Sequence, residues 1–261
     1  PMANTDTTFH APVRDENTPT PYSDPIGAAS AYWGEERIWD SKANAHNPMF
    51  DQDGRVWYTA RIRGPDNPDY CREGSDHPSA KLTATNRAGR HLSVYEPETG
   101  EYHFVDICFS THHLMFAEDE NNTLWTSGGG EVIGWLDSNL FMETKDAARA
   151  QGWTAAILDT NGNGQRDEGY ADISEPVDPA RDKRINPRFY AVMPNPADGS
   201  VWGSTSFEFP GRLVRLNPGA NPPATALAEQ YNIPLPGFAS RGCLLYTSDA
   251  ADDTPCVDLG G

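Results

Sequence analysis

Short apolar runs separated by polar turns recur along the chain, and three stretches share one arrangement. Each begins with a short apolar strand, passes through a turn rich in Asp, Asn or Gly, and continues into a strand that opens with an aliphatic residue and a Trp. Pairs such as Asp53-Gly54 supply the positive φ angles of tight hairpins. Each stretch therefore predicts a β-hairpin with its Trp in the core; the three stretches are 46–59, 112–127 and 189–204, with Trp57, Trp125 and Trp202.

A second apolar element follows each hairpin, in residues 92–105, 132–136 and 213–219. Two hairpins per repeat make a four-stranded antiparallel sheet, and consecutive sheets of this kind arrange radially as a β-propeller. The sequence therefore predicts an all-β fold: a β-propeller fragment of about three four-stranded blades plus a partial blade, with one short inserted helix. A β-sandwich is the alternative fold.

The repeats are spaced more widely than the roughly 40 to 50 residues of a common blade, so insertions are expected. We place the blades at about 46–106, 112–160 and 189–231, all within a partial propeller spanning 28–242. The short helix is expected over 138–151, with Ser138 as its N-cap. Residues 1–27 have the composition of a Pro/Thr-rich linker, residues 28–40 are expected to form outer strands of a preceding blade, and loop insertions are expected at 64–89 and 161–184.

Residues 243–261 resemble the in-frame translation of a transposon-type sequencing adapter interrupted by a short variable index. We expect this stretch to be a non-native tail, so the natural frame would continue past Gly242 and the remaining blades would be missing. The alternative is an acidic tail with a fortuitous match.

Acidic residues outnumber basic ones by 38 to 20, which gives a net charge of −18. This charge argues against a nucleic-acid partner or an anionic membrane surface. No stretch reaches the roughly 18 consecutive apolar residues of a membrane helix, and no basic and apolar signal pattern opens the sequence. We expect an extracytoplasmic protein, periplasmic or secreted, whose signal is not present in this fragment.

The recurring signature His/Pro-x-x-Phe/Ile, Asp-Gly-x-Val/Leu-Trp-Phe/Tyr-Thr over about 41–231 resembles the streptogramin-lyase-like (virginiamycin B lyase-like) propellers. It is more distantly similar to the gluconolactonase and regucalcin group. The resemblance implies a substrate site at the central funnel, a divalent cation such as Mg²⁺, and a histidine general base. A propeller architecture alone does not specify an activity.

Three histidines are candidates for that chemistry. His46 and His112 occupy equivalent places, four residues before Phe50 and Phe116, where the innermost strand of a blade begins near the central channel. Strand alternation predicts that His113 faces away from His112. The three are candidate catalytic residues, either as cation ligands or as an acid–base pair, because imidazole titrates near neutrality. The alternative is that they hydrogen-bond neighbouring blades.

The segment from Asp159 to Glu168 matches the first part of a calcium loop. Carboxylate and amide oxygens fall at relative positions 1, 3, 5 and 9, a backbone carbonyl at position 7, and a Gly at position 6. Tyr170 stands at position 12, which excludes a normal EF-hand, so Glu168, Asp172 or Glu175 would complete the ligand set. The alternative is a solvated turn; the candidate metal residues are Asp159, Asn161, Asn163, Gln165, Asp167 and Glu168.

Cys71 and Cys108 flank the insertion-bearing first repeat and are candidates for one disulfide. Neither lies in a Cys-x-x-Cys pair, so zinc-ribbon, thioredoxin and covalent haem sites lack support. Asp76-His77, in the same insertion, is either a pair that reaches over the funnel or a simply exposed one.

Two classes of function remain open from the sequence. The first is a divalent-cation-dependent lyase or hydrolase that acts on a cyclic ester or lactone at the funnel. The second is a non-catalytic propeller that binds a small-molecule or glycan-type ligand or acts as a scaffold, with calcium ordering the 161–184 loop.

Overall fold

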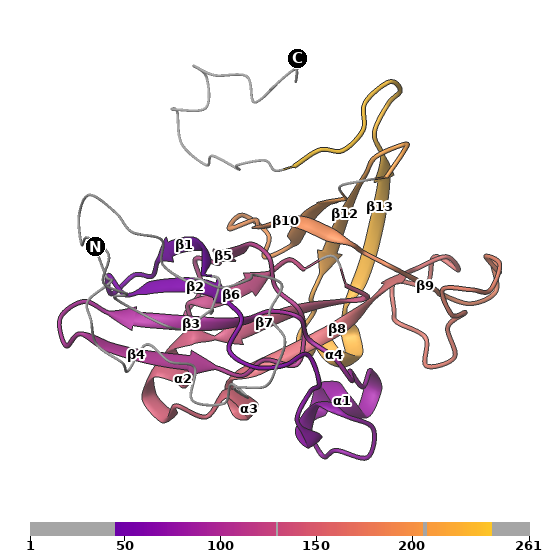
Figure 1. Ribbon diagram of the computed structural model, residues 1–261. Coiled ribbons are helices and arrows are strands. Elements are labelled where there is room, and N and C mark those ends of the chain that lie inside the picture. The colour runs from indigo at the N-terminus through magenta and orange to yellow at the C-terminus, as the bar shows by residue number, and fades with distance from the viewer. Residues whose placement is uncertain (1–44, 129, 206–207, 242–261) are drawn as a thin grey trace.

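The computed structural model describes residues 45–128, 130–205 and 208–241, and its regular structure is mostly β (Figure 1). The first four strands form one antiparallel meander in chain order. The registers of the second with the third strand and of the third with the fourth are continuous, with Trp57 opposite Val94 and Val94 opposite His103, whereas that of the first with the second shifts between His46 and Met49. The strands of this first blade are β1 (His46–Phe50), β2 (Val56–Ala60), β3 (His91–Glu96) and β4 (Glu101–Val105).

Two further four-stranded meanders follow the first. A single parallel pair, Leu158 with Ala228, joins their last strands, and β9 (Lys183–Ile185) pairs with the free side of β8. The fold is therefore an all-β, propeller-like arrangement of three four-stranded blades. The second blade contains β5 (Leu114–Phe116), β6 (Thr123–Thr126), β7 (Val132–Asp137) and β8 (Gln151–Leu158), and the third contains β10 (Phe189–Pro194), β11 (Val201–Thr205), β12 (Arg212–Asn217) and β13 (Leu227–Asn232). The linker at 1–27, the partial blade at 28–40 and the tail at 243–261 lie outside the described residues.

The first hairpin shows why the recurring Asp-Gly turn precedes a Trp. Gly54 has a φ of +79°, which L-residues with a Cβ adopt only with strain. The carboxylate of Asp51 accepts hydrogen bonds from the backbone N–H of Asp53 and Arg55 and from Trp57 Nε1, at 3.0, 2.9 and 2.9 Å. One buried carboxylate thus fixes both the turn and the indole.

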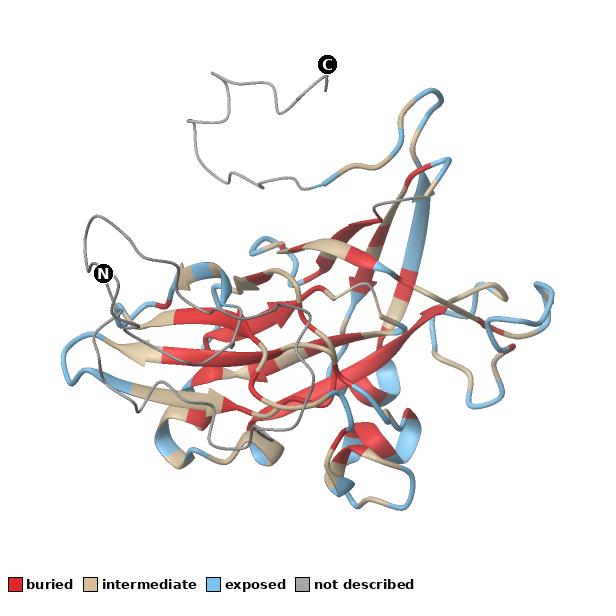
Figure 2. Ribbon diagram, in the orientation of Figure 1, coloured by how far each residue is buried: buried red, intermediate tan, exposed pale blue. Residues whose placement is uncertain are grey.

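The blade cores are apolar, and buried residues run along the middle of the sheets (Figure 2). Trp57 is fully buried and Trp125 nearly so, whereas Trp202 is partly exposed. Trp202 stacks on Tyr231 with ring centroids 5.7 Å apart and lines an apolar cavity of about 540 Å³ on the third blade. Within the described ranges no further sheet covers this face, so Trp202 is less buried than its counterparts.

Hydroxyl groups two residues after each Trp link neighbouring blades. Thr59 Oγ1 donates to the carbonyl of His112 at 3.2 Å, and Ser127 Oγ donates to the carbonyl of Tyr190 at 2.5 Å. Ser204 holds the same position in the third blade; its Oγ is buried and has no hydrogen-bond partner in the described part of the chain. The linkage of one blade to the next is thus encoded in the repeat.

The helical insertion of the second blade differs in detail from the sequence expectation. Two short helices, α2 (Ser138–Thr144) and α3 (Ala147–Ala150), replace the single helix expected over 138–151. The N-cap is Asp137, whose side chain accepts from Leu140 N–H at 2.8 Å. Ser138 was the wrong residue for this role because its hydroxyl donates to the carbonyl of Asn122 at 2.7 Å.

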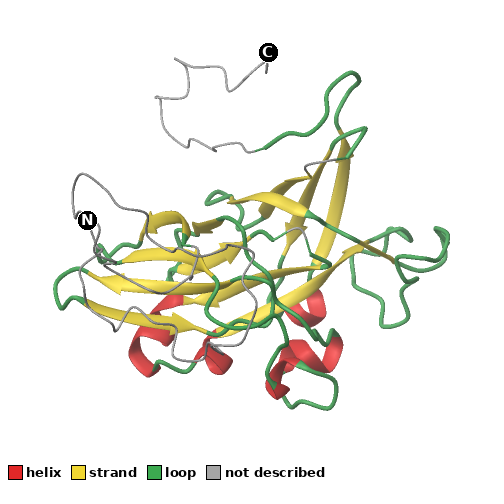
Figure 3. Cartoon of the chain, in the orientation of Figure 1, coloured by secondary structure: helices red, strands yellow, loops and turns green. Residues whose placement is uncertain are grey.

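Further short helices are present that the sequence pattern did not predict. They are α1 (Pro78–Leu82), α4 (Pro222–Thr225) and a 3-10 helix, Asp69–Cys71. The helices gather along one side of the sheets (Figure 3). In the described part of the chain, none of them is long and apolar enough to cross a membrane.

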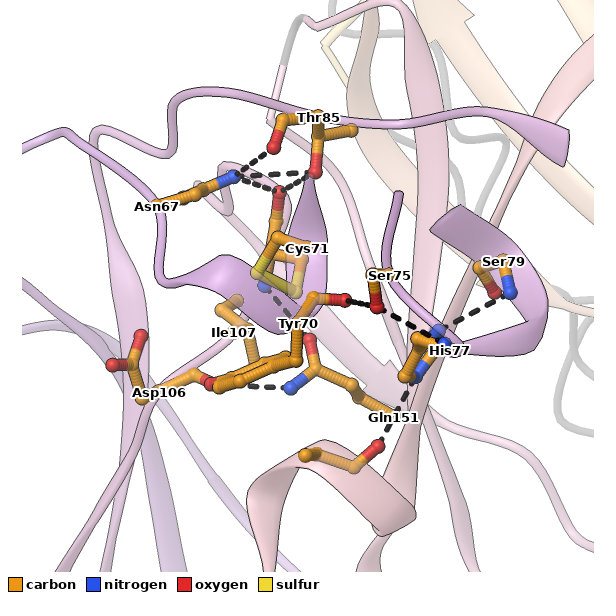
Figure 4. Close-up of a disulfide and its surroundings, with 12 residues drawn as sticks. Asn67, Tyr70, Cys71, Ser75, His77, Ser79, Thr85, Asp106, Ile107 and Gln151 are labelled. Carbon is orange, nitrogen blue, oxygen red and sulfur yellow. Dashed lines mark hydrogen bonds between the residues drawn. A yellow bond between two sulfur atoms is a disulfide. The ribbon is translucent and has the colours of Figure 1, made fainter. Parts of the chain in front are cut away.

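The first insertion is held by a disulfide between Cys71 and Cys108 (Figure 4). Beside it, Asn67 Nδ2 donates to the carbonyl of Cys108 at 2.8 Å. His77 does not reach over the funnel: its Nδ1 caps α1 by accepting from Ser79 N–H, and its ring stacks on Trp153 at 4.5 Å. The insertion is therefore packed against the second blade.

Candidate functional site

His46, His112 and His113 lie together where the first strands of adjacent blades begin. His46 opens β1, and the other two directly precede β5. One ring nitrogen from each residue lies within 4.8 Å of the others, and the ring centroids are 4.1 to 5.3 Å apart. The fold thus brings together all three histidines singled out from the sequence.

The expectation that His113 faces away from His112 was wrong. The two Nδ1 atoms are 3.1 Å apart, and the rings meet edge to face. The reason is that β5 starts only at Leu114, so the two histidines lie in a bend to which strand alternation does not apply.

Hydrogen bonds fix which nitrogen of His113 carries its proton. Its Nδ1 lies 2.7 Å from the carbonyl of Tyr190, which only accepts, so Nδ1 must be the donor. In the tautomer with its proton on Nδ1, the imidazole lone pair is on Nε2. A backbone carbonyl that receives the second N–H is the usual partner of a metal-ligating histidine.

The surroundings of His112 and His46 favour the neutral form of both rings. Burial, followed by the charges of His113, His46 and Arg90, lowers the pKa of His112 to about 4. Burial, Arg90 and His113 also lower the pKa of His46 below its ordinary value. Both rings are therefore unprotonated at pH 7 and have lone pairs for a cation or a donor group.

A cleft of about 470 Å³ opens beside the histidines and is formed by residues from all three blades. Its charged lining is entirely cationic: Arg61, Arg90 and Arg188, with no Asp or Glu among the lining residues. Arg61 Nε donates to the carbonyl of Gly89, and Arg188 lies 3.5 Å from Glu208. In a chain with a net charge of −18, this concentration of positive charge favours an anionic ligand. The remaining lining residues are Gly89, Ser110, Thr111, His112, Gly128, Phe189 and Tyr190.

The donor set of the histidine cluster does not fit Mg²⁺. This ion requires oxygen ligands in octahedral geometry, whereas the cluster offers three imidazole nitrogens and, within the described ranges, no carboxylate. Three imidazoles suit borderline ions such as Zn²⁺, Co²⁺ or Ni²⁺.

A second group, Glu96, Glu101 and His103, lies on the hairpin of β3 and β4. His103 Nε2 is 3.0 Å from Glu96, and Lys145 Nζ is 3.5 Å from the same carboxylate. Charge compensation by Lys145 makes this group an ion-pair network.

The sequence-predicted calcium residues are only partly brought together. The side chains of Asn161, Asn163 and Asp167 are in mutual hydrogen-bond contact, and Asp159 accepts from the loop backbone. Glu168 is exposed and has no hydrogen bond or ion pair to the loop among the described residues.

Sequence reasoning did not single out Arg61, Arg90 and Arg188 as a site. Arg61 and Arg90 stand at the two ends of the β2–β3 connection, and Arg188 stands between β9 and β10, so no spacing rule relates the three. Tyr190 belongs to the third repeat, in which Phe189 and Tyr190 stand where the first two repeats have His46 and His112. Its ring lies 5.0 Å from that of His112.

The fold and this site define an all-β, propeller-like protein with a histidine cluster beside an arginine-lined cleft. Comparison with protein-family models, curated proteins and solved structures found no match to this chain.

Proposed function

We propose that the cleft binds a small anionic ligand and that the protein is a divalent-cation-dependent lyase or hydrolase of a cyclic ester or lactone. The observation that carries this proposal is the convergence of three imidazoles from two blades beside a cationic cleft shared by three blades. The resemblance of the repeat signature to streptogramin-lyase-like propellers agrees with this class of reaction.

The residues of the chain fall into two roles under this proposal. The guanidinium groups of Arg61, Arg90 and Arg188 are suited to hold a carboxylate or to stabilise negative charge that develops on an ester oxygen. Lone pairs on His46, His112 and His113 are suited to hold a cation, which would polarise the ester carbonyl.

The low pKa of His112 argues for a ligand role over a base role. A general base works best with a pKa near the operating pH, and a value of about 4 lies well below it. The hydrogen bond of His113 Nδ1 to the carbonyl of Tyr190 leaves Nε2 as the nitrogen suited to bind the same cation.

Turnover of a panel of lactones and cyclic esters, with Zn²⁺, Co²⁺ or chelator present, tests the proposal. We expect cation-dependent ring opening that falls about 100-fold or more in His112→Ala, because this variant lacks one of the three cation ligands. The matched control is His103→Gln, which alters a histidine of the separate ion-pair network and should leave turnover unchanged.

Equal turnover in the wild type and His112→Ala would place the chemistry elsewhere and contradict the proposal. Saturable binding of panel members without ring opening would instead support the non-catalytic binding propeller.

A further inference from the structure

The strand register places two aspartates at the same end of one ladder. β8 and β9 are antiparallel, with Leu158 opposite Lys183. Asp159 follows Leu158 and Asp182 precedes Lys183, so the two aspartates leave the ladder side by side. Between them in sequence runs the loop that matches the beginning of a calcium site.

In the first half of this loop, side-chain oxygens accept hydrogen bonds from backbone N–H groups of the same loop. The carboxylate of Asp159 accepts from the backbone N–H of Asn163 and Gly164, at 3.1 and 2.8 Å. Asn161 Oδ1 accepts from Asn163 N–H, and Asn163 Oδ1 accepts from Gln165 N–H. Each of these oxygens keeps a second lone pair that can face a cation.

Asp182, which lies outside the loop motif, has a buried carboxylate oxygen without a partner among the described residues. Its residue is completely buried, yet Oδ1 has no hydrogen-bond partner in the described part of the chain. Oδ2 accepts from Asp167 N–H at 2.8 Å, and Asp182 N–H donates to Asp167 Oδ2 at 3.2 Å. Asp167 in turn accepts from the side-chain amides of Asn161 and Asn163, so Asp182 is joined directly to the loop.

No close ion pair neutralises these carboxylates, although the charge of Arg166 acts on Asp182. Among the described residues, neither Asp159, Asp167 nor Asp182 has a Lys, Arg or His nitrogen within 4.0 Å. The adjacent Lys183 is directed elsewhere, with Nζ donating to the carbonyls of Asp172, Ile173 and Glu175. One oxygen of this buried carboxylate lacks a hydrogen-bond partner, which is costly, and a bound cation removes that cost.

We propose that this loop binds Ca²⁺ and that Asp182, from the strand paired with β8, completes the site in place of the Glu found at position 12 of an EF-hand. The other ligands are Asp159, Asn161, Asn163, the carbonyl of Gln165, and Asp167. Calcium is favoured over Mg²⁺ because the set is large, all-oxygen and includes a backbone carbonyl. This site is separate from the histidine cleft and does not depend on the proposed reaction.

The sequence-based candidates for closing the site are engaged in other contacts. Glu175 accepts from Asp172 N–H and pairs with Arg181 at 2.8 Å. Asp172 lies 3.7 Å from Arg184. A cation bound by Asp159 and Asp182 would hold both ends of the insertion together, next to β8 and β9. The role of the cation is therefore to order this loop.

Calcium titration of the full chain, followed by calorimetry and by the thermal unfolding midpoint, tests the site. We expect binding of about one Ca²⁺ with a dissociation constant of about 10⁻⁶ to 10⁻³ M and a rise in the midpoint, with a much smaller response to Mg²⁺. Asp182→Asn, which keeps the shape, should weaken Ca²⁺ binding at least about tenfold.

Glu168→Gln and Glu175→Gln are the matched controls, and they should retain wild-type affinity. Asp159→Asn, at a partly exposed ligand, provides a second loss-of-affinity variant if Asp182→Asn does not fold. No response of the wild type to millimolar Ca²⁺ would overturn the site. Wild-type affinity in Asp182→Asn would overturn the role of Asp182.

Discussion

Replacing Cys71 and Cys108 together by Ser should lower the free energy of unfolding by about 3 to 4 kcal/mol. The bond closes a loop with a sequence separation of 37 residues, and opening it increases the conformational freedom of the unfolded chain. Both Cys residues are fully buried in the cluster shared by the first two blades. The effect is therefore expected in the global transition, measured by urea denaturation at pH 7.

The control for the disulfide is the effect of a reducing agent. Reduction should destabilise the wild type by a similar amount and leave the double-Ser variant unchanged. An unfolding midpoint that is the same in the wild type and the variant would show that the loop is held by its hydrogen bonds alone, among them the contact of Asn67 with the carbonyl of Cys108.

Lowering the pH from 6.5 towards 3 should destabilise the fold through His91. This residue is completely buried, and its Nδ1 accepts from Ile62 N–H at 3.4 Å. Burial, then the charges of Arg63 and Arg61, lowers its pKa to about 3. Below pH 6.5 the unfolded state therefore binds a proton that the folded state does not, so stability falls as the pH falls, by about 1.4 kcal/mol per pH unit. The loss from this group is about 3 kcal/mol at pH 4.

Urea denaturation of the wild type and His91→Asn between pH 7 and pH 4 isolates this contribution. The variant is expected to be less stable at pH 7, and its stability should decline less steeply with acid, because carboxylates titrate equally in both proteins. Parallel curves for the two proteins would contradict the assignment to His91.

Local sequence signals predicted much of the fold. The Asp-Gly turns and the recurring Trp defined hairpins that the structure contains, because both depend on a few neighbouring residues. The pairing of Cys71 with Cys108 was one of the options that the sequence left open, and the structure contains it. The exposure of Trp202 was not predictable from its repeat, since burial depends on what covers a sheet and not on the strand itself.

The candidate sites were less predictable where they depend on tertiary placement. His46 and His112 were found through their equivalent repeat positions, but the orientation of His113 depended on where β5 starts. Asp182 was not noticed at all, because its relation to Asp159 is set by the pairing of β8 with β9 across an intervening loop. The predicted N-cap of α2, Ser138, was one residue too late, because Asp137 and Ser138 are both good capping residues.

The most direct test of the central claim is Co²⁺ binding, followed by visible absorption and calorimetry on the full chain. If the three imidazoles form a cation site, about one equivalent of Co²⁺ should bind and give nitrogen-ligand absorption bands. His112→Ala should lose this signal, and Asp182→Asn should keep it. Failure of the wild type to bind Co²⁺, or an unchanged signal in His112→Ala, would contradict a cation site at the histidine cluster.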